Sequence, residues 1–262
     1  DRGFLFSDSV YEVTTILGGS LVDWVGHADR LQKSLNFLNI KMPLARETLL
    51  DLHRELIKLN ALEDGLIYMQ VSRGSAERDF LISGNLEASL VLFSQEVNLL
   101  DYNRLNRCLR VVTVPECRWM HRDIKTTQLL AASLMKTEAY TRGFDDAWFV
   151  EDGYITEGTS SNAFIVLKNR KIISRGVGKA ILAGVTRFSI FESAKSLGFE
   201  VEERPFSVSE AENAKEAFIT SATNFIASVV EINGKLIGNG DVGSVTKLLR
   251  DQYLNDMKLT AS

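Results

Sequence analysis

A lysine, an acid and a cluster of small hydroxyl residues are the part of this sequence best suited to chemistry. Lys125 is followed later in the chain by Glu157, and Glu157 is followed at once by the hydroxyl-rich residues 159–161. A lysine amine can bond covalently to an aldehyde, and a carboxylate can pair with a ring nitrogen. Hydroxyls and backbone amides can hold a phosphate. Together these residue types predict an enzyme that uses pyridoxal 5'-phosphate.

Further segments have the composition of anion-binding sites. Gly184, Val185 and Thr186 precede an apolar-periodic helix, where a glycine lets the backbone approach an anion and the positive helix end attracts it. The small residues 220–223 follow a predicted strand, and Arg30 could give a charge-assisted phosphate contact. Each segment alone also fits an ordinary role, such as a solvated side chain or a plain helix start. Their combination favours a cofactor that carries a phosphate.

The elements that must position these residues are read from the hydrophobic periodicity. In the first part of the chain, helix 46–59 is predicted to bury Leu50, Leu52, Leu56 and Leu59, and residues 72–84 are predicted to form a polar loop. The predicted elements there are a hairpin of strands 10–17 and 21–25, helices 27–38 and 46–59, and strands 66–71 and 88–93.

The second part of the chain also mixes strands and helices, and Gly158 with the hydroxyl residues 159–161 favours a turn. The predicted elements are strand 107–114, helix 126–141, strands 147–150, 162–166 and 171–174, helix 186–197, strands 200–205 and 216–221 with a helix between them, hairpin 229–232 and 235–237, and helix 242–254. Because hairpins interrupt the alternation of strand and helix, an α+β fold fits better than a doubly wound parallel sheet. The pattern lapses around residues 98–106, which predicts two domains, 1–100 and 101–262.

Composition excludes several classes of protein. With 262 residues and 45% hydrophobic content the chain can bury a full core. The net charge of −4 and the absence of basic runs argue against nucleic-acid binding, and no apolar stretch is long enough to cross a membrane. Two cysteines, Cys108 and Cys117, and three scattered histidines predict no metal site. Reduced thiols are expected, and with them a cytoplasmic location.

The chain resembles the fold-type IV pyridoxal phosphate enzymes nearly from end to end. This family contains D-amino acid transaminases, branched-chain aminotransferases and aminodeoxychorismate lyases, and the resemblance is strongest to the D-amino acid transaminase branch, especially through residues 67–74 and 230–235. The other segments that carry it are 1–4, 8–12, 27–31, 123–125, 156–158 with 161–162, 182–187 and 220–223. The family implies a small α/β domain and a larger domain built on a mixed, barrel-like sheet. It also implies a further strand ahead of Asp1.

The resemblance assigns roles to particular residues. Lys125 would form the Schiff base and move the proton, and Glu157 would keep the ring nitrogen protonated. The implied cofactor contacts are Lys125, Arg30, Glu157, Leu182, Gly184, Val185, Thr186, Ser221 and Ala222. The implied substrate contacts are Tyr11, Tyr68, Arg78 and Phe80. In this family the loop that carries Arg78 comes from the neighbouring subunit, which implies a homodimer with a shared active site.

One departure concerns the substrate loop. The D-amino acid transaminases carry Arg-x-His there, whereas this chain has Arg78, Asp79 and Phe80. Phe80 cannot donate a hydrogen bond, which indicates an altered carboxylate site. The expected reaction is transfer of the amino group of D-amino acids, such as D-alanine or D-glutamate, to 2-oxo acids by a ping-pong mechanism through pyridoxamine phosphate. The alternatives are an (R)-selective amine or branched-chain L-amino acid transaminase, an aminodeoxychorismate lyase, and a non-enzymatic small-molecule binding protein.

Overall fold

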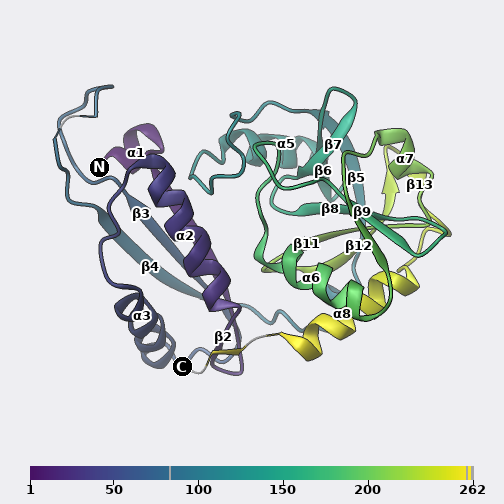
Figure 1. Cartoon of the computed structure of the whole chain (residues 1–262), viewed down its shortest axis with the longest axis horizontal. Coiled ribbons are helices and arrows are strands. Elements are labelled where there is room, and N and C mark those ends of the chain that lie inside the picture. Colours follow the sequence, from purple (N-terminus) through teal and green to yellow (C-terminus); the bar gives the residue numbers. More distant parts are fainter. Residues whose placement is uncertain (83, 258, 261–262) are drawn as a thin grey trace. The chain divides into compact units, whose positions relative to one another are not determined.

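The protein divides into two compact units. We describe it from a computed structural model, which covers residues 1–82, 84–257 and 259–260. Unit 1 comprises residues 1–98 and 124–129 together with 259–260, and unit 2 comprises residues 99–123 and 130–257. The predicted domain boundary at residue 100 stays a prediction. Figure 1 labels most elements of both units.

Unit 1 is an antiparallel sheet with two longer helices packed on one face. The sheet has the strand order β14-β2-β1-β3-β4, and α2 packs on β1 while α3 packs on β4 (Figure 1). Its elements are α1 (Arg2–Phe6), β1 (Ser9–Leu17), β2 (Ser20–Val22), α2 (Trp24–Leu38), α3 (Arg46–Leu59), β3 (Gly65–Ser72), β4 (Ser89–Glu96) and β14 (Leu259–Thr260).

Alternation along β1 gives the sheet a buried face and a more open face. Val10, Glu12 and Ile16 are fully buried on the face that α2 covers, whereas Tyr11 and Val13 point to the opposite face and are half-buried. The predicted strand 21–25 is too long, because Asp23 takes a left-handed backbone conformation with φ of 53° and α2 begins directly after it.

Helix α3 has the predicted bounds but not the predicted buried face. Leu49, His53 and Ile57 are buried, while Leu59 is 74% exposed. His53 can occupy a buried position because its Nδ1 is 2.7 Å from the Leu49 carbonyl oxygen and its ring packs edge-on against Trp24.

Unit 2 is built on a nine-stranded mixed sheet. Strand β12 lies parallel to β5 and β5 lies parallel to β6, whereas β8 and β11 are antiparallel. The strand order is β10-β9-β8-β11-β12-β5-β6-β7, with β13 paired to β12. Strand β7 also contacts β8, so that the sheet curves as in a partly closed barrel. Together with unit 1, this architecture confirms the predicted α+β class.

The elements of unit 2 pack around an apolar core that includes Trp148, Ile165 and Phe206. They are α4 (Tyr102–Leu105), β5 (Cys108–Pro115), α5 (Leu130–Thr141), β6 (Asp146–Glu151), β7 (Tyr154–Gly158), β8 (Asn162–Val166), β9 (Lys171–Ser174), α6 (Val185–Ser196), β10 (Glu200–Glu203), α7 (Val208–Glu212), β11 (Glu216–Ser221), β12 (Phe225–Ile232), β13 (Lys235–Leu236) and α8 (Ser244–Asp256).

One prediction next to the candidate chemistry is wrong. Helix 126–141 begins only at Leu130, because the chain on either side of Thr126 bonds to β1 instead. The Lys125 carbonyl oxygen accepts from the Tyr11 N–H, and the Thr127 N–H donates to the Ser9 carbonyl oxygen. Glu157 lies on strand β7, which pairs antiparallel with β6 and ends just before residues 159–161.

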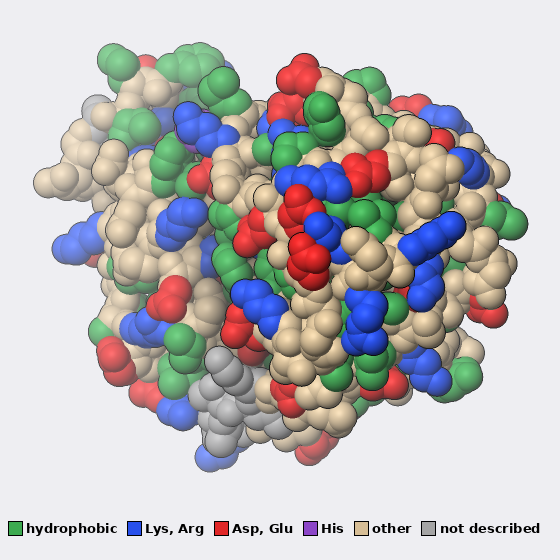
Figure 2. Space-filling view, turned by 45° about the vertical axis from the view of Figure 1, so that its right-hand side comes forward, with side chains coloured by type: hydrophobic (Ala, Val, Ile, Leu, Met, Phe, Trp, Pro, Cys, Tyr) green, Lys and Arg blue, Asp and Glu red, His purple; other side chains and the backbone are tan. Residues whose placement is uncertain are grey.

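The surface carries mixed charge. On the face that Figure 2 shows, Lys and Arg side chains are interspersed with Asp and Glu. Within residues 1–82, 84–257 and 259–260, none of the helices has the length and apolar character needed to cross a membrane.

Candidate active site

Lys125 lies in a short extended segment, residues 124–129, that runs beside β1. The Tyr11 N–H donates to the Lys125 carbonyl oxygen at 3.0 Å, and the Lys125 N–H donates to the Ser34 Oγ at 3.3 Å. Thr126, the next residue, is buried and forms an antiparallel bridge to β1. Side chains alternate along an extended chain, and Lys125 is half-buried on the open side, with its Nζ 3.9 Å from the centroid of the Tyr11 ring. Lys125 and Tyr11, two of the predicted site residues, are therefore in contact.

A row of aromatic rings extends this group across the open face of the sheet. The Tyr11 ring stacks on Tyr68 at 5.5 Å, and Tyr68 stacks on Phe93 at 4.9 Å. The Tyr68 hydroxyl donates to the Gln70 Oε1 at 2.7 Å. Burial, with the neighbouring Tyr11 as a second cause, raises the pKa of Tyr68 to about 12. At neutral pH the hydroxyl therefore keeps its proton and acts as a donor.

Arg30 is fixed by a buried carboxylate. Glu12 accepts hydrogen bonds from the Arg30 Nε at 2.7 Å, the Arg30 Nη2 at 2.6 Å and the His27 Nδ1 at 2.8 Å. Burial opposes ionisation of Glu12, but the charge of Arg30 and these bonds outweigh it and lower its pKa to about 2. Sequence reasoning noted Glu12 only as part of a motif. A pattern that could have identified Glu12 is an acid predicted to be buried on one element, together with an arginine on the element that faces it.

Glu157 is a buried acid of unit 2 with partners on both oxygens. It is 4% exposed, and its Oε1 accepts from the Arg118 Nη1 at 2.8 Å. Its Oε2 accepts from the Asn162 Nδ2 and from the Leu182 N–H, each at 3.0 Å. Burial raises the pKa of the Glu157 carboxyl, although Arg118 acts in the opposite direction. Sequence reasoning missed Arg118, whose only signal was a charged pair, Glu116 and Arg118, directly after a buried strand.

The start of α6 has the form of an anion site. Gly184 is the N-cap residue with φ of −65°, and in the part of the chain that the structure describes no side chain caps this helix end. Thr186 in the first turn is buried and Val185 is half-buried. A side chain at position 184 would overlap the Oδ1 of Asn162. The glycine therefore keeps the helix start close to the residues that hold Glu157.

Ser221 and Ala222 lie where β11 ends. The Ser221 Oγ accepts hydrogen bonds from the Asn224 N–H at 3.1 Å and from the Asn224 Nδ2 at 3.2 Å. These bonds close the turn that follows the strand and fix the position of the hydroxyl oxygen.

The substrate loop predicted from the resemblance is exposed and lies against α1. The Arg78 guanidinium is 5.6 Å from the centroid of the Phe6 ring and 5.7 Å from that of Phe80. The two rings are themselves 5.4 Å apart, and the Arg2 Nη1 donates to the Asp79 carbonyl oxygen at 2.7 Å. Among the described residues Arg78 forms no ion pair, so its charge is available to an anion.

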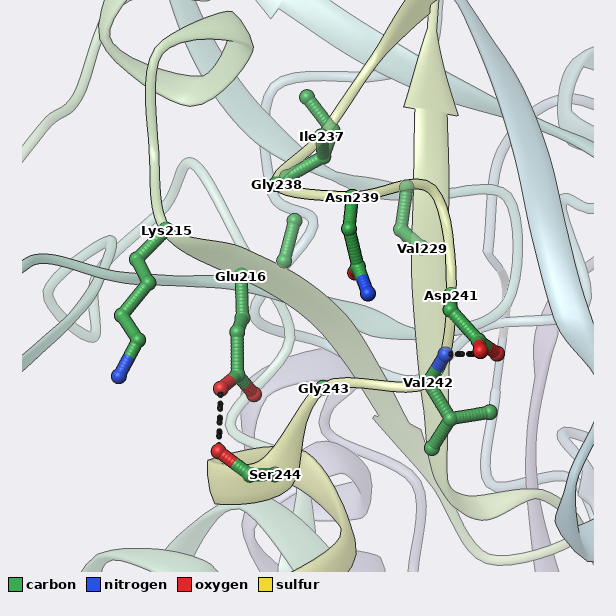
Figure 3. A pocket seen from close by; sticks show the side chains of 11 residues that line it. Lys215, Glu216, Val229, Ile237, Gly238, Asn239, Asp241, Val242, Gly243 and Ser244 are labelled. Carbon is green, nitrogen blue, oxygen red and sulfur yellow. Dashed lines mark hydrogen bonds between the residues drawn. The ribbon is translucent and has the colours of Figure 1, made fainter.

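A cavity of about 360 Å³ in unit 2 contains none of the predicted site residues. Lys215, Glu216, Asp241 and Ser244 are among the residues that line it, as Figure 3 shows. The Glu216 carboxylate accepts from the Ser244 Oγ at 3.3 Å and from the backbone N–H of Thr246 at 2.9 Å. Glu216 therefore caps the start of α8, and we assign this cavity a structural role.

The predicted site residues divide between the two units. The structure brings Lys125, Tyr11 and Tyr68 together, Glu157 and Leu182 together, and Arg78 and Phe80 together. The roles assigned to these residues stay predictions. Unit 1 holds Lys125, Arg30, Tyr11, Tyr68, Arg78 and Phe80, and unit 2 holds Glu157, Leu182, Gly184, Val185, Thr186, Ser221 and Ala222.

Comparison with known proteins identifies the family. The family model for class IV amino-transferases matches residues 9–232. The D-alanine aminotransferase of Bacillus licheniformis is 32% identical over 257 residues, which are 98% of this chain and 90% of that protein.

Two of the solved structures with the same fold have names that give different activities. The branched-chain amino acid aminotransferase of Thermobaculum terrenum, solved in its pyridoxal phosphate form, has a TM-score of 0.88 at 22% identity and covers 99% of this chain and 91% of that one. A candidate 4-amino-4-deoxychorismate lyase of Legionella pneumophila has a TM-score of 0.88 at 21% identity and covers 98% of this chain and 94% of that one. The predicted fold type is confirmed, and the chain belongs to the class IV aminotransferases as a pyridoxal 5'-phosphate-dependent enzyme.

Proposed function

We propose that this aminotransferase acts on D-amino acids such as D-alanine and D-glutamate, with 2-oxo acids as acceptors. The observation that carries the proposal is the similarity to D-alanine aminotransferases at 32% and 31% identity over nearly the whole chain. The solved neighbours act on other substrates according to their names, but at 22% and 21% identity they support the fold alone.

The residues present fit pyridoxal phosphate. Among the described residues no side chain caps the backbone amides at the start of α6, and Gly184 leaves them open to close approach, which suits a phosphate. Glu157 is a buried carboxylate with oriented partners, which suits a ring nitrogen. Lys125 supplies a half-buried primary amine, the group that attacks an aldehyde when it is unprotonated. The donor set therefore matches the three polar regions of the cofactor.

In this proposal Lys125 would bond to the cofactor and carry a proton to and from the substrate Cα, and Glu157 would keep the ring nitrogen protonated. When bound, the cofactor supplies a ring that withdraws electrons from the substrate carbon. Leu182 contacts the ring, and the phosphate is held by Arg30, Gly184, Val185, Thr186, Ser221 and Ala222.

Tyr11, Tyr68, Arg78 and Phe80 are proposed to select the substrate. Arg78 is the cation expected to bind the substrate carboxylate, since among the described residues it has no acidic partner. Phe80 supplies an apolar wall. This phenylalanine also favours a second candidate function, the transamination of (R)-amines that lack a carboxylate.

A half-reaction test separates these functions. The holoenzyme is mixed with D-alanine, L-leucine or (R)-1-phenylethylamine without acceptor, and the absorbance of the bound cofactor is followed. D-alanine is expected to convert the cofactor fastest. Conversion by L-leucine alone would contradict the proposal, and faster conversion by the amine would establish the second candidate.

We also propose a homodimer in which the Arg78 loop serves the partner's site. In this loop the side chains of Phe80 and Leu81 are 78% and 75% exposed, and Phe4 in the neighbouring α1 is 90% exposed. Exposed apolar side chains grouped in this way are typical of interfaces. Mixing subunits of Lys125→Ala and Arg78→Ala is expected to restore activity at low D-alanine, because each mixed dimer would contain one intact site. No gain after confirmed subunit exchange would refute the shared site.

The cytoplasm remains our proposal for the location of the enzyme. Both cysteines, Cys108 and Cys117, are free, as expected of a reducing compartment.

A further inference from the structure

Arg118 forms a buried bridge between two carboxylates. Its Nε and Nη2 donate to the two oxygens of Glu116 at 2.9 and 2.7 Å, and its Nη1 donates to Glu157 at 2.8 Å. The side chains are 11%, 5% and 5% exposed for Arg118, Glu116 and Glu157. The guanidinium also lies 4.1 Å from the centroid of the Phe149 ring. With ion pairs on two sides and a ring contact, this arginine has little freedom to turn.

Glu116 is fixed from its other side. It accepts from the Thr156 hydroxyl at 3.0 Å, and the Arg122 Nε lies 3.7 Å away. Arg122 in turn contacts Glu151 at 2.8 Å. Burial acts to raise the pKa of Glu116, but the hydrogen bond and charge of Arg118 outweigh burial and lower it. The bridge is therefore one part of an alternating row of charges, in which each buried acid faces an arginine.

Glu157 needs this cation. A buried carboxylate is costly to ionise unless a partner compensates its charge. Asn162 and Leu182 are neutral donors on Oε2, so Arg118 is the cation in contact with this acid among the described residues. Oε1 accepts one bond in the part of the chain that the structure describes. A carboxylate oxygen can accept two, which leaves room for a ring N–H.

We propose that Arg118 is a positioning residue that keeps Glu157 ionised and aligned, so that the proton shared with the cofactor lies on the ring nitrogen. This inference rests on the proposed role of Glu157. Arg118 contacts the carboxylate directly, and the ring nitrogen would lie beyond it. Moving the proton from the carboxylate to the nitrogen therefore moves positive charge away from the arginine. Without Arg118 the proton would return to Glu157, and the ring would withdraw electrons less strongly.

The test reads the ring nitrogen directly. The wild type and variants are reconstituted with pyridoxal phosphate labelled with nitrogen-15 in the ring, and the protonation state of that nitrogen is followed by NMR against pH. Arg118→Gln is expected to lower the pH midpoint of ring protonation by about one unit or more, since an ion pair shifts a titration by about that much. Arg118→Lys, which keeps the charge, is expected to give a smaller shift. Arg142→Gln, which alters an exposed arginine of the same unit, is expected to match the wild type.

The outcomes separate this inference from the proposed function. If Glu157→Gln abolishes ring protonation while Arg118→Gln and Arg118→Lys leave it unchanged, Glu157 has its proposed role but the role of Arg118 is refuted. If Glu157→Gln also leaves the ring protonated, the proposed role of Glu157 itself fails. A change in thermal stability alone, with an unchanged midpoint, would mark Arg118 as merely structural. If Arg118→Gln does not fold, the pH midpoint of ring protonation measured for Arg118→Lys decides the question instead.

Discussion

The Glu12 carboxylate offers a sharp test of the electrostatics of unit 1. Replacing it by Gln keeps the size of the side chain but removes the negative charge of the carboxylate that His27 and Arg30 both contact. An amide would also turn an N–H₂ group toward donors that now bind an oxygen. Arg30 would then lose the carboxylate that binds its Nε and Nη2, and breaking a buried ion pair in this way is among the more costly changes in a protein interior.

The magnitude follows from the pKa. The folded protein lowers the pKa of Glu12 from 4.5 to about 2. Since each pH unit between the folded and unfolded pKa corresponds to about 1.4 kcal/mol, Glu12→Gln is expected to lower the free energy of unfolding by roughly 3 kcal/mol at pH 7. A carboxyl with a lowered pKa contributes stability that is fully present above pH 4.5. This contribution is lost as the pH falls toward 2, so the difference between the variant and the wild type should shrink there.

Amide hydrogen exchange of β1 and α2 in the enzyme without cofactor measures this effect, because local exchange reports the stability of unit 1 separately from unit 2. Glu55→Gln on the exposed side of α3 is the matched control, with an expected change within about 0.5 kcal/mol. Equal protection in both variants would refute the reasoning that Glu12 stabilises unit 1 through its charge.

Three further predictions concern the substrate, the cofactor and acid stability. Arg78→Ala is expected to raise the KM for D-alanine roughly tenfold or more through a lost charge-assisted bond, and equal effects on (R)-1-phenylethylamine would contradict this role. Gly184→Ala is expected to weaken cofactor binding at least about tenfold, because the new methyl group displaces Asn162 from Glu157. Gly178→Ala, which has open space, is its control in equilibrium dialysis. The His53 pKa is lowered to about 4 by burial, so unit 1 should lose stability as the pH falls from 6.5 to 4, by up to about 3 kcal/mol. In acid unfolding His53→Phe should lack this loss, and an unchanged profile would exclude His53 as its source.

Strong periodicity and turn chemistry made much of the fold predictable. Helix α3 has the predicted bounds, and the hairpin of β12 and β13 turns at the predicted Asn233 and Gly234. The buried face of α3 was not predictable from leucine positions, because a histidine with a backbone acceptor and an aromatic neighbour replaced an apolar residue. Residues 126–129 were also predicted to be helical. Thr127 bonds instead to Ser9 of β1, a strand far away in the sequence, which the local pattern does not contain.

The candidate site was predictable where motifs carry it, but its supporting residues were not. The contact of Lys125 with Tyr11 depends on strand register, which a single sequence does not contain. Arg118 looked like any surface arginine until burial and the positions of Glu116 and Glu157 were known. In our proposal, residues 78–80 select the substrate together with a partner subunit, and a single sequence contains neither of these.

The chain path has a consequence for how the enzyme is made. Unit 1 takes its strands from residues 1–98, the segment that carries Lys125 from residues 124–129, and its edge strand β14 from residues 259–260. No single cut in the chain separates the units. During synthesis the first strands emerge early, but Lys125 arrives later and the edge strand arrives later still. Unit 1 therefore cannot be completed on the ribosome before nearly all of unit 2 has been translated.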